Sequence, residues 1–148
     1  MFCAGYRTFT LAWSIISPVV SVKVRNVPHR IDIVTDPGYI LVEQFGNVTT
    51  DDVELIRGEI FEVVAREGLF RVAVDVRNQI NDYSITEMFN MTVDHAVAET
   101  PFPKPRICLL VRPDQEDNAK FIENVGMNRG MTIRYFTDRD SGLNWLMD

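Results

Sequence analysis

Cysteine and histidine are scarce in this chain, which has two of each. Cys3 and Cys108 belong to no metal or redox motif, and Cys108 lies in an apolar run where a small buried thiol is the usual finding. A disulfide framework would need more cysteines in a shorter chain, so we expect free thiols and a reducing compartment. No carboxylate or thiol stands at metal-ligand spacing from His29 or His95, so we predict no metal site. His95 borders the apolar face of a predicted helix and should be partly packed.

The motifs that mark catalysis or nucleotide binding are missing as well. The chain has no Gly-x-Gly-x-x-Gly loop, no Walker-type loop and no Gly-x-Ser-x-Gly elbow. Its paired acids, Asp51–Asp52 and Glu116–Asp117, stand in the first turns of predicted helices, where negative charge complements the helix dipole. We therefore predict a non-enzymatic protein that needs no cofactor.

Positive charge is in short supply, with 15 lysines and arginines against 21 acidic residues and a formal net charge of −6. This balance argues against nucleic-acid binding, which needs a basic surface to displace counterions from phosphates. Residues 9–24 are largely apolar, but Ser17 and Pro18 are among the residues that interrupt them and no clear cleavage site follows. We expect a retained, soluble segment in a cytoplasmic protein. Membrane contact, which Phe9 and Trp13 would make, is not our expectation.

The chain does contain enough apolar and aromatic residues, 46% and 10%, to build a core. We predict one domain over residues 1–148, with 1–30 as an N-terminal strand extension and 31–148 as the core. Residues 8–15 and 20–24 alternate between apolar and polar with a period of two, which predicts an N-terminal β-hairpin. That hairpin could pack on the domain surface, form a dimer contact or face a membrane.

Strand and helix patterns alternate from Ile31 onward, which predicts a mainly parallel sheet with right-handed crossovers, covered by about four helices. Asp36-Pro37-Gly38 predicts a type II hairpin turn, since Pro presets the first turn position and Gly allows a positive φ. Gly58, inside the first helix, suggests a close helix–sheet contact. The expected elements are strands at 31–35 and 39–45, a helix capped by 49–52 and ended by Gly68, a strand at 71–76, a polar loop at 77–83, a helix from Ser84, a strand at 106–111, a helix from 113–114, a strand at 131–136, and a helix capped by 137–140.

This order of elements resembles the SpoIIAA-like family, which includes anti-sigma factor antagonists and the STAS domains of anion transporters. More particularly, it resembles a bacterial branch of small stand-alone proteins of largely unknown role. The resemblance covers roughly residues 30–148. The residues that carry it are the hairpin 31–45 with the following 46–52, the strand end 75–77, and the closing segments 133–136 and 142–146. It implies an α/β fold of the SpoIIAA-like type.

The resemblance also implies a place for a switch. In anti-sigma antagonists, a phosphorylatable Ser follows the third core strand at a helix N-terminus, within a pattern like Asp-Ser-Ser-Gly. Asp75 and Ser84 can be placed on that pattern, whereas the doubled Ser and the Gly are missing. Ser84 with Glu87 also forms a capping box, so plain capping competes with phosphorylation as its role. The candidate switch or interaction loop comprises Asp75, Arg77, Asn78, Asp82, Tyr83 and Ser84.

Two functional hypotheses remain open from the sequence. The first is a regulatory or protein-interaction module that uses this loop, with a protein partner or as a homodimer. The second is a small-ligand protein that binds an anion, a nucleotide or a lipid-like molecule in a cleft at the strand ends, where ligands gather in open α/β sheets. Arg77, Arg112 and Arg139 are the candidate anion-binding residues of that cleft. They could instead pair with neighbouring carboxylates, namely Asp75, Asp114 and Asp138.

Overall fold

The computed structural model describes residues 19–21, 28–98 and 100–148. Within these ranges, six strands form one mixed sheet in which the strands follow one another in chain order. The first two neighbouring pairs are antiparallel and the next three are parallel. The strands are β1 (Val19–Ser21), β2 (His29–Val34), β3 (Tyr39–Val48), β4 (Arg71–Asn81), β5 (Arg106–Leu110) and β6 (Thr132–Phe136).

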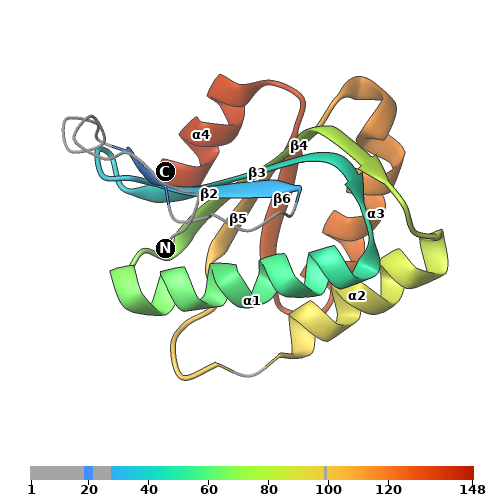
Figure 1. The fold of residues 1–148 in the computed structure, drawn as a ribbon, viewed down its shortest axis with the longest axis horizontal. Coiled ribbons are helices and arrows are strands. Elements are labelled where there is room, and N and C mark those ends of the chain that lie inside the picture. The colour runs from blue at the N-terminus through green and yellow to red at the C-terminus, as the bar shows by residue number, and fades with distance from the viewer. Residues whose placement is uncertain (1–18, 22–27, 99) are drawn as a thin grey trace, which may run out of the picture.

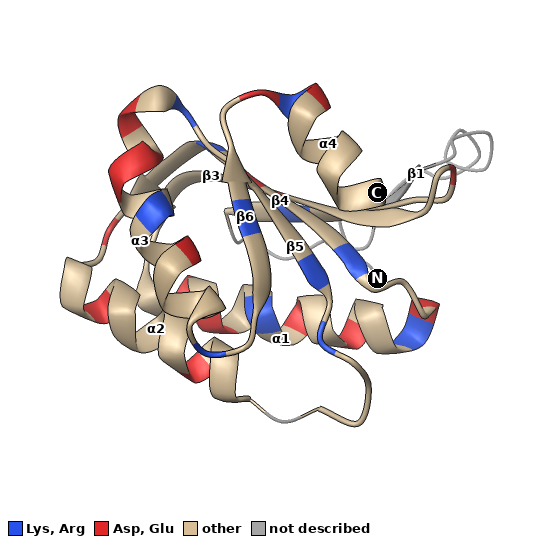
Figure 2. Ribbon diagram, turned by 180° about the vertical axis from the view of Figure 1, so that it is seen from behind, with Lys and Arg blue, Asp and Glu red and all other residues tan. Residues whose placement is uncertain are grey.

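Helices cover the two faces of this sheet unequally. Figure 1 shows α4 on one side of the strands and α1 and α2 on the other, and Figure 2 shows the same arrangement from behind. Helix α3 packs against β5 on the face that α1 and α2 share. In the described part of the chain, no helix is both long and apolar enough to cross a membrane. The helices are α1 (Thr50–Glu67), α2 (Ile85–Val97), α3 (Glu116–Met127) and α4 (Arg139–Met147), with a 3₁₀ turn, η3 (Pro113–Gln115), before α3.

The predicted order of elements is confirmed from β2 to α4, and with it the mixed, mainly parallel α/β fold class. The first strand of the predicted N-terminal hairpin, 8–15, lies outside the described residues. From its second strand, β1 pairs antiparallel with β2 and so extends the main sheet. In the turn between β2 and β3, Gly38 has the predicted positive φ, 106°, and the Asp36–Pro37 peptide bond is cis.

The predicted helix caps are also confirmed. The hydroxyl of Thr49 accepts a hydrogen bond from the Asp52 backbone N–H, and Gly68 ends α1 in the left-handed conformation with a φ of 66°. The hydroxyl of Ser84 caps α2 by accepting from the Glu87 backbone N–H, and the Glu87 carboxylate accepts from the Ser84 backbone in return. Local side-chain chemistry therefore fixes where these helices begin.

The larger part of the core lies between α1 and the sheet. Ile56 and Ile60 of α1 pack against a layer of branched residues that includes Val42 and Val72. Their spacing of four residues places them on one face of the helix. The close contact expected at Gly58 was wrong: Gly58 is exposed, and no atom of another element lies within 4 Å of where its Cβ would be. It faces solvent because it is two residues from each of these buried isoleucines.

The smaller part of the core lies beneath α4. Leu146 packs against Cys108 and Leu110 of β5. Gly142 permits this close approach, because a Cβ at that position would lie 2.8 Å from the Cys108 Sγ. Burial raises the pKa of the Cys108 thiol to about 12, with the charge of Asp75 adding to the effect. Cys108 is therefore the buried free thiol that the sequence predicted.

Strand β4 is longer than predicted, and the expected polar loop 77–83 was wrong over most of its length. Residues Arg77 and Asn78 of the candidate loop belong to β4, which runs to Asn81 and pairs in parallel with the end of β3. A register shift between Glu43 and Phe45 of β3 allows this pairing to continue. The segment lies beyond the end of β5, so β3 is the strand that pairs with it. Because it is not enclosed between two strands, its sequence does not have the apolar character of a buried strand.

Candidate functional site

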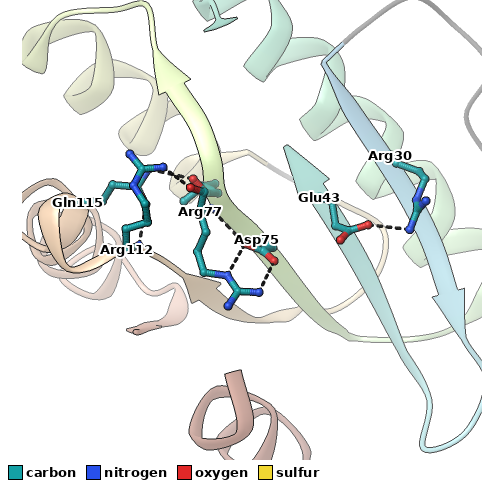
Figure 3. A network of polar contacts seen from close by, with 7 residues as sticks. Arg30, Glu43, Asp75, Arg77, Arg112 and Gln115 are labelled. Carbon is teal, nitrogen blue, oxygen red and sulfur yellow. Dashed lines mark hydrogen bonds and ion pairs between the residues drawn. The ribbon is translucent and has the colours of Figure 1, made fainter. Parts of the chain in front are cut away.

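The extended end of β4 has β3 on one side and side chains, instead of a strand, on the other. Strand β5 ends at Leu110, opposite Asp75, so the carbonyl groups that follow in β4 have no strand partner there. The Gln115 Nε2 donates a hydrogen bond to the Val76 carbonyl oxygen at 2.9 Å, and the Arg112 Nη1 donates to that of Arg77 (Figure 3). These side chains satisfy backbone groups that would otherwise be left open at the sheet edge.

An ion pair lies at the point where this extension begins. The Arg77 guanidinium donates to both carboxylate oxygens of Asp75, at 3.0 Å and 2.8 Å. Burial alone would raise the pKa of Asp75, but the hydrogen bonds and charge of Arg77, together with the charge of Arg139, hold it below its ordinary value. On the neighbouring strands, the Arg30 Nη2 donates to Glu43 at 2.8 Å (Figure 3). The face of the sheet on which α4 packs therefore carries a row of paired, opposite charges.

The other two arginines of the predicted anion site do not form an open cationic cleft. Arg112 donates from Nε to the carboxylate of Asp114 at 2.9 Å, so its charge is already paired. Arg139 begins α4 and is exposed. Its predicted partner Asp138 instead caps α4 by accepting from the backbone N–H and hydroxyl of Ser141. An anion binding at this edge would therefore have to compete with carboxylates that are already in place.

The remaining residues of the candidate loop connect β4 to α2. Ser84 is exposed, and its hydroxyl donates to the carboxylate of Glu87 at 3.0 Å. Asp82 and Asn78 are exposed as well, and the Asp82 backbone N–H donates to the carbonyl of Val48 at the end of β3. The candidate loop therefore presents polar groups to solvent, and a switch at Ser84 stays a prediction.

Between the sheet and α2 lies a cavity of about 150 Å³, whose lining includes none of the three arginines of the predicted strand-end cleft. Its walls are mainly apolar and come from strands β3 to β6 and from all three helices on this face. Helix α2 thus lies beside α1 and α3. Its C-terminal end packs on the sheet, where Ala96 belongs to a buried cluster with Ile107 and Ile133, and the cavity lies beneath the residues before it. The lining includes Ile60 of α1, Val74 of β4, Met88 and Thr92 of α2, Leu109 of β5 and Ile122 of α3.

A few polar side chains line the same cavity. The Gln79 Nε2 donates to Asn81 and, at 3.2 Å, to the Tyr83 hydroxyl, whereas its Oε1 is buried and has no partner among the described residues. Arg57 donates from Nη2 to a glutamate one turn earlier, and its Nη1 is buried without a partner in the same part of the chain. Burial lowers the pKa of His95 to about 4, with the nearby charges of Arg57 and a lysine adding to the effect. These groups can provide hydrogen bonds to a bound molecule.

Of the predicted site residues, Tyr83 alone lines this cavity, and burial raises its pKa. The sequence contained two weak signals for the other residues that line the cavity. Gln44 and Gln79 are polar residues at inward positions of strands, and α2 carries methionines where a tightly packed helix would carry leucine. In the described residues, no group of three His, Cys, Asp or Glu side chains is placed to hold a metal ion.

The fold and the site together define a small α/β protein with a mixed sheet, three helices over one face and an apolar cavity beneath the middle helix. No protein-family model and no curated protein matches the chain. Among solved structures, it is similar to an uncharacterised protein of the DUF3478 family with a SpoIIAA-like fold, from Shewanella loihica PV-4. The TM-score is 0.53 at 14% sequence identity, over 86% of this chain and 98% of that chain. The likeness establishes that this chain has a SpoIIAA-like fold, as the resemblance implied.

Proposed function

We propose that the protein binds a small, mainly apolar molecule in the cavity between α2 and the sheet. The cavity is the observation that supports this function. The cavity is partly open to solvent, so water can reach its apolar walls. Removing apolar surface from water contributes about 25 cal/mol per Å². A bound molecule that covers these walls would therefore stabilise the fold.

The lining indicates what kind of molecule fits. Pockets for small ligands are commonly apolar, with a few polar groups that fix orientation, and this cavity has that composition. A cavity of about 150 Å³ holds a molecule the size of benzene. The strand-end edge is less suited to an anion or a nucleotide, because Arg77 and Arg112 are paired with carboxylates.

Thermal unfolding in the presence of small molecules tests the proposal. We expect benzyl alcohol and 1-hexanol to raise the midpoint of unfolding and inorganic phosphate and ATP to leave it unchanged. A ligand at 100 times its Kd adds about 2.7 kcal/mol of stability, which corresponds to about 5–10 °C for a chain of this length. If neither apolar probe raises the midpoint at concentrations that leave the fold intact, the proposal is wrong.

A matched pair of variants places the binding in the cavity. Val74→Phe puts a larger side chain into the cavity wall, whereas Val97→Phe makes the same change at an exposed position of α2. We expect Val74→Phe to abolish the stabilisation by benzyl alcohol and Val97→Phe to retain it. Equal stabilisation of both variants by benzyl alcohol would show that the binding site lies outside this cavity.

We propose, as a second candidate function, a regulatory interaction with a protein partner or a second copy of the chain. It is supported by the exposure of two large apolar residues, Phe45 in β3 and Ile80 near the end of β4. Each follows a glutamine that lines the cavity, so both point to the opposite face of the sheet, away from α1, α2 and α3. Ser84, the candidate switch of this function, begins helix α2, and partner capture by variants at Ser84 tests the function.

A further inference from the structure

We propose that the molecule bound in the cavity carries a carboxylate, which is held between Arg57 and His95. This inference rests on the proposed ligand-binding function and specifies the ligand's chemical class: a small monocarboxylate with an apolar ring or short chain. The polar groups of the cavity differ between its two ends, and that difference carries the inference.

Arg57 supplies a hydrogen-bond donor that nothing in the described chain accepts from. Its Nη2 donates to Glu54, whereas Nη1 has less than 1 Å² of exposed surface and no partner among the residues that the structure describes. A buried guanidinium N–H without an acceptor destabilises the fold. Arg57 is among the residues that line the cavity, and a turn of its guanidinium toward that space would give Nη1 an acceptor on a bound molecule. A carboxylate is the acceptor whose geometry and charge suit a guanidinium best.

His95 and Lys104 make the same end of the cavity favourable for negative charge. The His95 ring lines the cavity and packs edge-on against Phe61, at 5.4 Å between ring centroids. Burial lowers its pKa, and the positive charges of Arg57 on α1 and Lys104 before β5 add to this effect and bring the pKa to about 4. The neutral imidazole can donate one hydrogen bond to a carboxylate. The two cations that disfavour a protonated His95 would attract that carboxylate.

The other end of the cavity disfavours a carboxylate. The amide N–H groups of Gln79 are directed to Asn81 and Tyr83, so its free atom is the acceptor Oε1. An acceptor facing a carboxylate repels it. The Arg57 end is therefore where the ligand's charge would lie, with its apolar part against Val74 and Leu109 of the sheet.

Benzoate and benzyl alcohol separate this inference from the proposed function, because both contain the same ring and only one carries a charge. Hydrogen bonds to charged groups correspond to about a tenfold to hundredfold change in affinity. We expect benzoate to bind the wild type at least about tenfold more tightly than benzyl alcohol does, as measured by NMR titration of backbone amides. Equal affinities would overturn the carboxylate and leave the cavity function standing. If neither molecule shifts amides that line the cavity, both proposals fail.

Two arginine variants identify the anchor. Arg57→Gln should weaken the binding of benzoate at least about tenfold more than it weakens the binding of benzyl alcohol, and so remove the preference for benzoate. Arg66→Gln, which removes the same charge from the exposed last turn of α1, should retain the preference. Loss of the preference in both variants would show a general charge effect and overturn the assignment to Arg57.

The titration of His95 in the wild type gives a readout that does not depend on a variant folding. A carboxylate beside the imidazole favours its protonated form. We therefore expect saturating benzoate to raise the pKa of His95 from about 4, and benzyl alcohol not to raise it. A pKa that is the same with both molecules would contradict the placement of the carboxylate next to His95.

Discussion

Two buried carboxylates, Asp32 and Asp75, lie on the same face of the sheet but in different electrostatic surroundings. Burial is the main influence on Asp32 and raises its pKa, although Arg30 lies 2.8 Å away and opposes the effect. Asp75 experiences a similar burial, yet the hydrogen bonds of Arg77 outweigh it and lower the pKa. The two residues should therefore contribute to stability with opposite dependence on pH.

The sign follows from linkage between protonation and folding. The folded pKa of Asp75 lies below its ordinary value of 3.8. Its contribution is therefore fully present above that value and is lost as the pH falls through the folded pKa. The folded pKa of Asp32 lies above 3.8, so the folded protein holds that proton more tightly than the unfolded chain. Stability from Asp32 is present below pH 3.8 and is lost as the pH rises through the folded pKa.

We predict that Asp75→Asn lowers the free energy of unfolding at pH 7 by about 2 kcal/mol, since Arg77 is partly exposed and solvent screens the pair. The loss should shrink below pH 4. Asp32→Asn should lower it by much less at pH 7, because burial already disfavours that charge. Urea unfolding of both variants between pH 3 and pH 7 measures this. Equal losses at pH 7 would contradict the assignment of Arg77 as the stabilising partner.

At the scale of single elements, the beginning of α2 separates a capping role of Ser84 from a switch. The Ser84 hydroxyl caps the helix by accepting from the Glu87 backbone N–H at 3.2 Å. Removing such a cap costs about 1 kcal/mol, whereas Asp caps a helix as well as Ser does. We therefore predict that Ser84→Ala lowers the free energy of unfolding by about 1 kcal/mol and that Ser84→Asp lowers it less.

Partner capture with the same two variants tests the second candidate function. If Ser84 is a switch, the negative charge of Ser84→Asp changes what the protein captures, and Ser84→Ala does not reproduce that change. Ser84→Ala also controls for the loss of the cap. Identical capture by wild type and both variants would restrict Ser84 to its structural role.

The helix caps and the extension of β4 show what sequence patterns can and cannot predict. Thr49, Ser84 and Asp138 could be identified as helix caps because capping is decided by residues within one turn. The extension of β4 could not be identified in this way. Its edge carbonyl groups accept hydrogen bonds from Arg112 and Gln115, which lie about 35 residues later in the chain. Such non-local partners make a polar segment stable as a strand, and no local pattern records them.

At the scale of the whole molecule, periodicity predicted the layers but not the distance between them. The apolar spacing on α2 indicates which side of the helix faces inward, and Met88, Thr92 and Ala96 are indeed buried. Spacing along one helix carries no information about how closely it approaches the sheet. That distance depends on the side chains of α1 and α3, which hold α2 from either side. The cavity and its polar groups Arg57 and Gln79 therefore became visible only in the fold.

This arrangement also predicts where the protein is least stable. Helix α2 packs on the sheet at its C-terminal end, where Ala96 belongs to a buried cluster with Ile107 and Ile133, whereas the cavity lies beneath the residues before it. Local opening is easiest where few apolar contacts are lost. We therefore predict that the amides of α2 exchange with deuterium faster than those of α1, which packs directly on the sheet.

Ligand binding should change that pattern in one place. A molecule in the cavity joins α2 to the strands, so saturating benzyl alcohol should slow exchange in α2 more than in α4, which lies on the opposite face of the sheet. The Val74→Phe variant should slow exchange in α2 without any added molecule, because the larger side chain takes the place of the ligand. Equal protection of α2 and α4 by benzyl alcohol would mean that the molecule stabilises the fold from a site other than this cavity.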